Sequence, residues 1–132
     1  MTTRLKATPL LAAAVAALTA CTAQTEREPE VRAPAVEIAG APERCIQTSR
    51  IQRTTVHDDR TIDFHLGRDV YRNTLPARCP GLGFEERFAY QTTIGQLCSS
   101  DTITVLQSGG GVRGPTCGLG EFVPVRYVDT AD

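Results

Sequence analysis

The sequence predicts a small, mainly β fold, either an antiparallel barrel or a sandwich of about six short strands, with one short helical turn and two disulfides. Three observations support this fold class. Short segments alternate apolar and polar residues, turn-forming residues recur every 8–15 residues, and four cysteines are spread over residues 45–117. With 132 residues, the chain has room for one ordinary domain.

Residues 1–20 have the layout of an export signal. Arg4 and Lys6 give the segment a positive start, and residues 10–18 form an apolar stretch of Ala, Leu and Val. Small residues follow and end at Cys21. The apolar stretch is shorter than the roughly 20 residues that a membrane span needs, so the pattern predicts a signal peptide.

The segment Leu18-Thr19-Ala20-Cys21 resembles the lipobox of bacterial lipoproteins. The resemblance implies that the signal is removed before Cys21 and that this residue carries fatty acyl chains such as palmitate, which anchor the protein in a membrane. Thr22, where a retained lipoprotein has Asp, implies the outer membrane. We therefore expect a periplasm-facing protein of the bacterial cell envelope. An ordinary secretory signal with Cys21 as a bystander is the alternative.

Residues 21–42 are predicted to form the acylated Cys and a flexible tether. After Cys21 this segment contains three Pro, four Glu and no aromatic residue. Such a composition buries too little apolar surface to offset the entropy lost on ordering. The boundaries that follow are a disulfide-stabilised β domain over residues 43–128 and a frayed tail over residues 129–132.

Six segments carry strand signals, which are β-branched or aromatic residues bounded by Asp, Gly or Pro. They are residues 53–56, 61–66, 70–75, 87–91, 102–106 and 121–127. The clearest is TIDFHL at residues 61–66, where polar and apolar residues alternate. This alternation predicts a strand that is buried on one face and solvated on the other. Pro124 in the last segment predicts an edge strand.

A short helical turn is predicted at residues 94–98. Thr93 and Gln96 have the spacing of a capping box, although Gly95 disfavours the turn. Residues 78–83 are predicted to form a loop because they contain Pro and Gly.

Residues 107–120 are predicted to form a long glycine-rich loop. Residues 109–114 within it match G-x-G-x-x-G. A dinucleotide site also needs a helix that opens there and an acidic residue about 20 positions later. Pro115 follows instead and the chain ends soon afterwards, so we interpret the match as a flexible loop.

Four cysteines remain beside Cys21, namely Cys45, Cys79, Cys98 and Cys117. An even number in a small exported domain predicts two disulfides. Zinc is the competing interpretation, but zinc ligands usually come in closely spaced pairs, and the gaps here are 33, 18 and 18 residues. Three pairings are possible. We favour Cys45–Cys98 with Cys79–Cys117, because the second pair joins two similar loops, CPGLG and CGLG.

Several sequence blocks resemble an uncharacterised domain family of small proteobacterial lipoproteins. The resemblance covers residues 45–125 and rests on blocks such as DDRTIDF at residues 58–64, YRNTLP at residues 71–76 and the two Cys-containing loops. It implies the limits of the domain. It carries no known activity, substrate or catalytic residue.

The densest polar cluster in the chain contains His57, Asp58, Asp59, Asp63 and His65. Imidazole and carboxylate groups bind divalent metal ions, so a metal site or small catalytic centre built from His57, Asp58, Asp63 and His65 is one hypothesis. The interpretation that we favour is a solvated hairpin, polar because it faces water. No G-x-S-x-G or C-x-x-C motif is present, so the sequence indicates no catalytic residue.

The charge and composition exclude other classes. A net charge of −1 disfavours a nucleic-acid partner, which would require a strongly basic face. We expect a membrane-anchored, non-catalytic binding or structural module without a cofactor, whose partner is an envelope protein or peptidoglycan. The alternative is a small metal-binding protein or enzyme that uses the His57 cluster.

Overall fold

The computed structural model describes residues 32–129. The predicted signal peptide, Cys21 with the segment that resembles a lipobox, and residues 130–132 lie outside the described residues. The described part is mainly β, as the sequence predicts, with ten short strands, one α-helix and one 3-10 turn. Every strand pairing among these residues is antiparallel.

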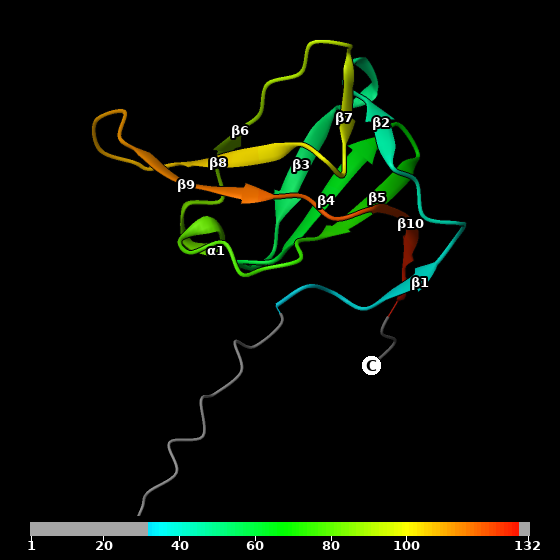
Figure 1. Ribbon diagram of the computed structural model, residues 1–132. Helices are drawn as coiled ribbons and strands as arrows, with labels where there is room; N and C mark the ends of the chain where they lie inside the picture. The colour runs from blue at the N-terminus through cyan, green and yellow to red at the C-terminus, as the bar shows by residue number, and fades with distance from the viewer. Residues whose placement is uncertain (1–31, 130–132) are drawn as a thin grey trace, which may run out of the picture.

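The strands form three sheets (Figure 1). The largest consists, in spatial order, of β1 (Val36–Ile38), β10 (Phe122–Tyr127), β5 (Asp69–Thr74), β4 (Thr61–Leu66) and β3 (Arg53–Val56). A second consists of β6 (Phe88–Ala89), β8 (Thr102–Leu106) and β9 (Arg113–Gly118). The third pairs β2 (Cys45–Gln47) with β7 (Gln96–Cys98). The sheets stay separate, so residues 32–129 do not form a closed barrel.

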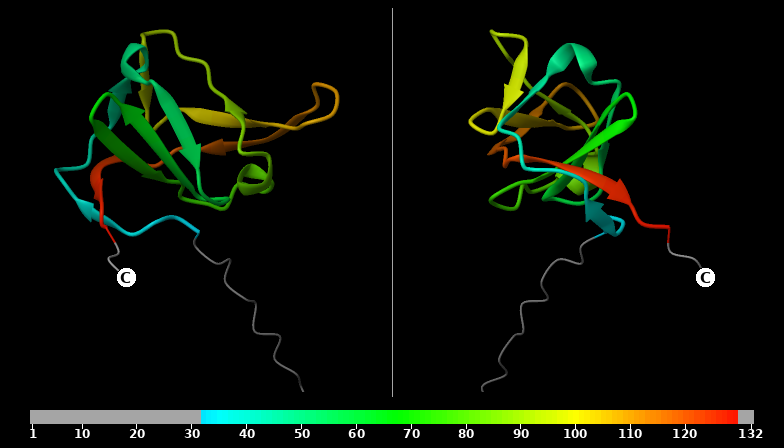
Figure 2. Two further views of the ribbon diagram at one scale, coloured as in Figure 1. Left: turned by 180° about the vertical axis from the view of Figure 1, so that it is seen from behind. Right: turned by 90° about the vertical axis from the view of Figure 1, so that its right-hand side faces the viewer.

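The hydrophobic core lies where the β6-β8-β9 sheet crosses the largest sheet (Figure 2). Phe64 of β4 is fully buried at its centre. Its ring meets Phe122 of β10 at 5.4 Å and Phe88 of β6 at 6.2 Å between centroids, both edge to face. Each such pair contributes about 0.5–1.5 kcal/mol beyond the burial of apolar area. The aromatic cluster therefore joins the two larger sheets.

Strand β4 differs from the predicted strand with one solvated face, because all six of its residues are buried. The face expected to be solvated carries Thr61, Asp63 and His65. Longer side chains from other strands of the same sheet, chiefly Arg72 of β5 and Tyr127 of β10, lie over this face. A period-two pattern shows which residues share a face, but not what covers that face.

The helical turn predicted at residues 94–98 is wrong. Gly95 has a φ of 72°, which a right-handed helix does not allow, and the chain continues as β7, paired with β2. The α-helix of the described region is α1 (Leu82–Glu85), inside the predicted loop 78–83 and just beyond it. The 3-10 turn η1 (Thr48–Arg50) follows β2.

Three other assignments change. β9 occupies the second half of the predicted loop 107–120, and β1 lies within the predicted tether 21–42, so the ordered fold begins earlier than predicted.

β10 is an interior strand despite Pro124, because the Pro124 backbone faces the β1 side, where its carbonyl accepts a hydrogen bond from Ala39 N–H. Its missing N–H therefore removes no hydrogen bond to β5.

Two disulfides join the cysteines in the favoured pairing, Cys45–Cys98 and Cys79–Cys117. The first connects the paired strands β2 and β7, where the two residues are direct cross-strand partners. The second connects the loop before α1 to β9. Closing chain segments of 53 and 38 residues lowers the entropy of the unfolded chain, and each stabilises the fold by about 4 kcal/mol.

Candidate functional site

The side chain of Asp63 is the centre of a buried polar cluster. Arg72 binds its carboxylate through two hydrogen bonds, from Nε to Oδ1 at 2.8 Å and from Nη2 to Oδ2 at 3.0 Å. His57 Nε2 lies 2.7 Å from Oδ2, and the Tyr127 hydroxyl donates to the same oxygen at 2.7 Å. The Asp63 side chain is 0% exposed, and those of His57 and Arg72 are each 13% exposed. We call Asp63, His57, Arg72 and Tyr127 the Asp63 cluster.

The strand register explains why these residues meet. Asp63 and Arg72 are direct partners in the antiparallel β4–β5 pair, so their side chains share one face of the sheet. His57 follows β3, which pairs with β4 on its other side. Tyr127 reaches over from β10, and its ring stacks on that of His65 with centroids 6.4 Å apart. Four strands or strand ends therefore converge on one carboxylate.

The electrostatics of the cluster favour a charged carboxylate. Burial by itself would raise the pKa of Asp63, but the hydrogen bonds from Arg72, Tyr127 and His57 together hold that pKa below its ordinary value of 3.8. Burial and the hydrogen bond to Asp63 raise the pKa of Tyr127 to about 12. The Tyr127 hydroxyl therefore stays protonated and donates a hydrogen bond to Asp63.

His65, which lies on the same face, is held in its neutral form. Burial and the nearby Arg53 charge lower the pKa of His65 below 6.5. Its Nε2 lies 3.1 Å from the Thr55 hydroxyl. A neutral imidazole beside a hydroxyl is one half of a nucleophile–base arrangement, but no carboxylate in residues 32–129 accepts a hydrogen bond from this ring. The pair is therefore a cross-strand polar contact between β3 and β4.

The structure brings together only some of the residues of the hypothetical metal site. His57 and Asp63 meet directly and His65 lies beside them, but Asp58 and Asp59 belong to the preceding turn. Asp58 accepts a hydrogen bond from Arg60 N–H, whereas Asp59 accepts from Gly83 N–H and from Arg78. Across the described residues, no three His, Cys, Asp or Glu side chains gather to hold a metal ion. The positive charge beside the Asp63 carboxylate is the guanidinium of Arg72, in the place where a metal site would have a cation.

The glycine-rich match ends up at the tip of the β8–β9 hairpin. Gly109, Gly110 and Gly111 all have positive φ angles, which glycine adopts at little cost. Glu85 of α1 accepts hydrogen bonds from the backbone N–H and the hydroxyl of Ser108. The tip is thus a turn that is hydrogen-bonded to α1, and it leads directly into the strand β9.

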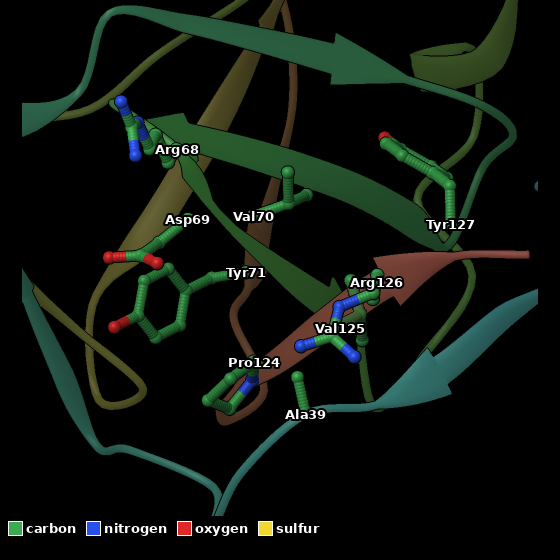
Figure 3. A pocket seen from close by; sticks show the side chains of 9 residues that line it. All are labelled: Ala39, Arg68, Asp69, Val70, Tyr71, Pro124, Val125, Arg126 and Tyr127. Carbon is green, nitrogen blue, oxygen red and sulfur yellow. The ribbon is translucent and has the colours of Figure 1, made fainter.

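An open cavity of about 470 Å³ lies beside the end of β10 (Figure 3). Tyr71 and Pro124 line one side of it, and Arg68 and Arg126 enter from the β4–β5 turn and from β10. Neither of these two guanidinium groups forms an ion pair within residues 32–129. The wall carboxylate, Asp69, lies 3.6 Å from Arg50. This cavity therefore presents free positive charge to solvent.

A family described as being of unknown function, DUF6491, matches residues 4–129. The chain belongs to this family. No curated protein and no solved structure matches it. The DUF6491 match extends across the whole described region and into the residues before it, which agrees with the uncharacterised domain family that the sequence blocks resemble.

Two members of the Asp63 cluster in this DUF6491 chain, Arg72 and Tyr127, were not predicted from the sequence. The position of Arg72 is predictable, because in a hairpin of residues 61–66 and 69–74 it lies opposite Asp63. The position of Tyr127 is not, because it lies 64 residues from Asp63 and on a strand that does not pair with β4. No helix in the part of the chain that the structure describes has the length and apolar character to cross a membrane.

Proposed function

We propose that the protein is a lipid-anchored lipoprotein of the bacterial cell envelope whose β domain is a non-catalytic binding module. The anchor is supported by the lipobox-like segment that ends at Cys21 after an export signal. Acyl chains on Cys21 make the membrane the first partner, with the domain facing the periplasm. Thr22 after the Cys favours the outer membrane.

The observation that supports a non-catalytic binding role is that the polar groups of the Asp63 cluster form their hydrogen bonds with one another. Its carboxylate accepts four hydrogen bonds from three side chains, counting that from His57, so none of its charge is directed at a ligand. His57, Asp63 and Arg72 line none of the described cavities, and Tyr127 lines the one beside β10 while its hydroxyl is bonded to Asp63. The cluster therefore supports the fold, and recognition falls to the surface.

The cavity beside β10 is the surface best suited to an anionic envelope component. Within residues 32–129 neither Arg68 nor Arg126 forms an ion pair, and guanidinium groups match carboxylates in shape and charge. Tyr71 and Pro124 add an apolar wall. Peptidoglycan, whose peptides carry carboxylates, is the partner that we propose for this cavity.

The anchor is tested by fractionation. Cys21→Ser in the full chain should release the protein from the membrane fraction or leave the signal uncleaved, and should remove the acyl mass. Thr22→Ser, which keeps the Cys, is the control and should stay membrane-bound. Unchanged partitioning and mass in Cys21→Ser would overturn the anchor.

The ligand is tested by sedimentation with purified peptidoglycan. The full chain in mild detergent should sediment with peptidoglycan, and the double variant Arg68→Gln/Arg126→Gln should lose most of this binding. Arg113→Gln, which removes an exposed Arg of β9 elsewhere on the surface, is the matched control. Equal sedimentation of the double variant and the unmodified chain, or no sedimentation of either, would contradict the proposal.

A further inference from the structure

Two strand edges face each other across a groove on the side opposite to that of Figure 1. β3 is the last strand of the largest sheet, and β6 is the last strand of the β6-β8-β9 sheet. A groove of about 390 Å³ separates them and is lined by Thr54 of β3 and Phe88 of β6. The left view of Figure 2 shows both strands on this side of the molecule. Each sheet thus ends at the same groove.

The alternation of hydrogen bonds in β3 leaves backbone groups free at this edge. His57 N–H donates to Thr61 O, so residues 57 and 61 form a hydrogen-bonded pair. In an antiparallel ladder such pairs alternate, which makes Thr55–Asp63 and Arg53–His65 the next ones. The N–H and C=O of Thr54 therefore point away from β4, toward the groove.

The same reasoning applies to β6. Leu106 N–H donates to Arg87 O, which makes residues 87 and 106 a hydrogen-bonded pair and Ala89–Thr104 the next. The N–H and C=O of Phe88 therefore point away from β8. The backbones of Thr54 and Phe88 form no hydrogen bond outside their own sheets within residues 32–129.

The side chains that line the groove suit an extended peptide. Half-buried Ile51, Phe88 and Tyr90 pack against the hydrophobic core and present apolar surface to the groove. Arg53 and Arg87 also line it, and neither has an ion-pair partner in the described chain, against the single acidic residue Glu86. The groove therefore offers apolar contacts within a net positive rim.

We propose that this groove takes up an extended, acidic peptide segment of an envelope protein by strand addition between β3 and β6. The added strand bonds to Thr54 on one side and to Phe88 on the other, and so links the two larger sheets into one. Every second side chain of the added strand packs against Phe88 and Tyr90, and its acidic residues pair with Arg53 and Arg87. The proposal rests on the proposed binding role and adds a protein partner to it.

The test is a selection from a displayed library of random octapeptides, with the full chain in mild detergent as bait. Selection should enrich peptides that alternate acidic and apolar residues, and binding of a synthetic copy should be measured by fluorescence anisotropy. Thr54→Pro removes the free N–H without removing a bond to β4, and should weaken binding by about tenfold or more. Thr54→Val keeps the N–H and should bind like the unmodified chain.

Two further measurements keep the result decisive. Arg53→Gln/Arg87→Gln should weaken binding of the acidic peptide, and this variant leaves the backbone of β3 free of proline. A peptide that is N-methylated at alternate residues should fail to bind. No enrichment over an unrelated bait, or equal binding by Thr54→Pro and Thr54→Val, would overturn the proposal. Membrane fractionation and peptidoglycan sedimentation do not depend on the groove. A failure of peptide binding at the groove can therefore be distinguished from a failure of the proposed function.

Discussion

The hydroxyl of Tyr127 donates a 2.7 Å hydrogen bond to the buried carboxylate of Asp63, although the two residues lie on strands that do not pair. The contact spans β5 and ties the C-terminal end of β10 to the centre of β4. Arg72 adds a second link of this kind, because its Nη1 donates to the Pro34 carbonyl at 2.9 Å, just before β1. Through Tyr127 and Arg72, the Asp63 carboxylate is thus linked to segments near both ends of the described chain.

Tyr127→Phe should destabilise the fold by about 1–3 kcal/mol, because it removes a donor from a buried charge while keeping the ring. The free energy of unfolding is measured by urea denaturation. Tyr90→Phe is the matched control, since the hydroxyl of this half-buried Tyr forms no side-chain hydrogen bond within residues 32–129. Equal losses in the two variants would show that the Tyr127–Asp63 bond contributes nothing specific.

Stability should fall as the solution is acidified, in two stages. Burial and the Arg53 charge lower the pKa of His65 in the folded state, so the unfolded chain binds the proton more readily and stability decreases as pH falls below about 6.5. The lowered pKa of Asp63 acts in the same direction below about 4, because folding favours its charged form.

The first stage is checked by measuring the melting temperature from pH 8 to pH 5. His65→Gln removes the ionisable ring, so the variant should show a smaller decrease over this range than the unmodified chain. The Asp63 carboxylate lies near His65, and its lowered pKa keeps it charged over this range in both proteins. A variant whose melting temperature falls just as steeply would refute the assignment to His65.

Gly120→Ala should be strongly destabilising, whereas Gly118→Ala should be nearly neutral. A Cβ at Gly120 would collide with the Thr74 carbonyl, while nothing lies within 4 Å of a Cβ at Gly118. The close approach at Gly120 allows the fully buried Asn73 amide to bridge its N–H and C=O, at 2.8 and 2.7 Å. Because backbone must move or this bridge must break, a loss of about 2–4 kcal/mol is expected. Thermal unfolding of the two variants provides the comparison.

Local signals predicted more of the fold than of the site. The bounds of β3, β4 and β8 follow from β-branched alternation between turn residues, since these patterns depend on neighbours in sequence. β7 was missed because it follows Gly95 and pairs with the distant strand β2. β9 pairs with β8, the strand directly before it, and was missed because its glycines and Pro115 are typical of a loop. The part of the cover over Asp63 that Tyr127 provides was missed because β10 is distant in the sequence, whereas Arg72 lies on β5, the strand directly after β4. Polar residues on an alternating strand look solvated until the register places Arg72 and Tyr127 above them.

The disulfide pairing makes a prediction that a single digestion tests. Arg residues separate the four cysteines, so trypsin yields residues 45–50, 79–87, 88–113 and 114–126, each with one Cys. Without reduction, mass spectrometry should find 45–50 linked to 88–113 and 79–87 linked to 114–126, with no free thiol in these four peptides. Any other linkage among them, or alkylation of one of their four cysteines in the unreduced denatured protein, would contradict the structure.

The energetic consequence of the second bridge is tested by replacing both of its cysteines. Cys79→Ser/Cys117→Ser should lower the free energy of unfolding by about 4 kcal/mol, because the unfolded chain regains the freedom of the closed segment. Since the Cys79 side chain is fully buried, Cys79→Ala/Cys117→Ala avoids leaving a buried hydroxyl without a partner and should be the more stable of the two double variants. If the Ala pair is as stable as the unmodified chain, the bridge is not what holds α1 against β9.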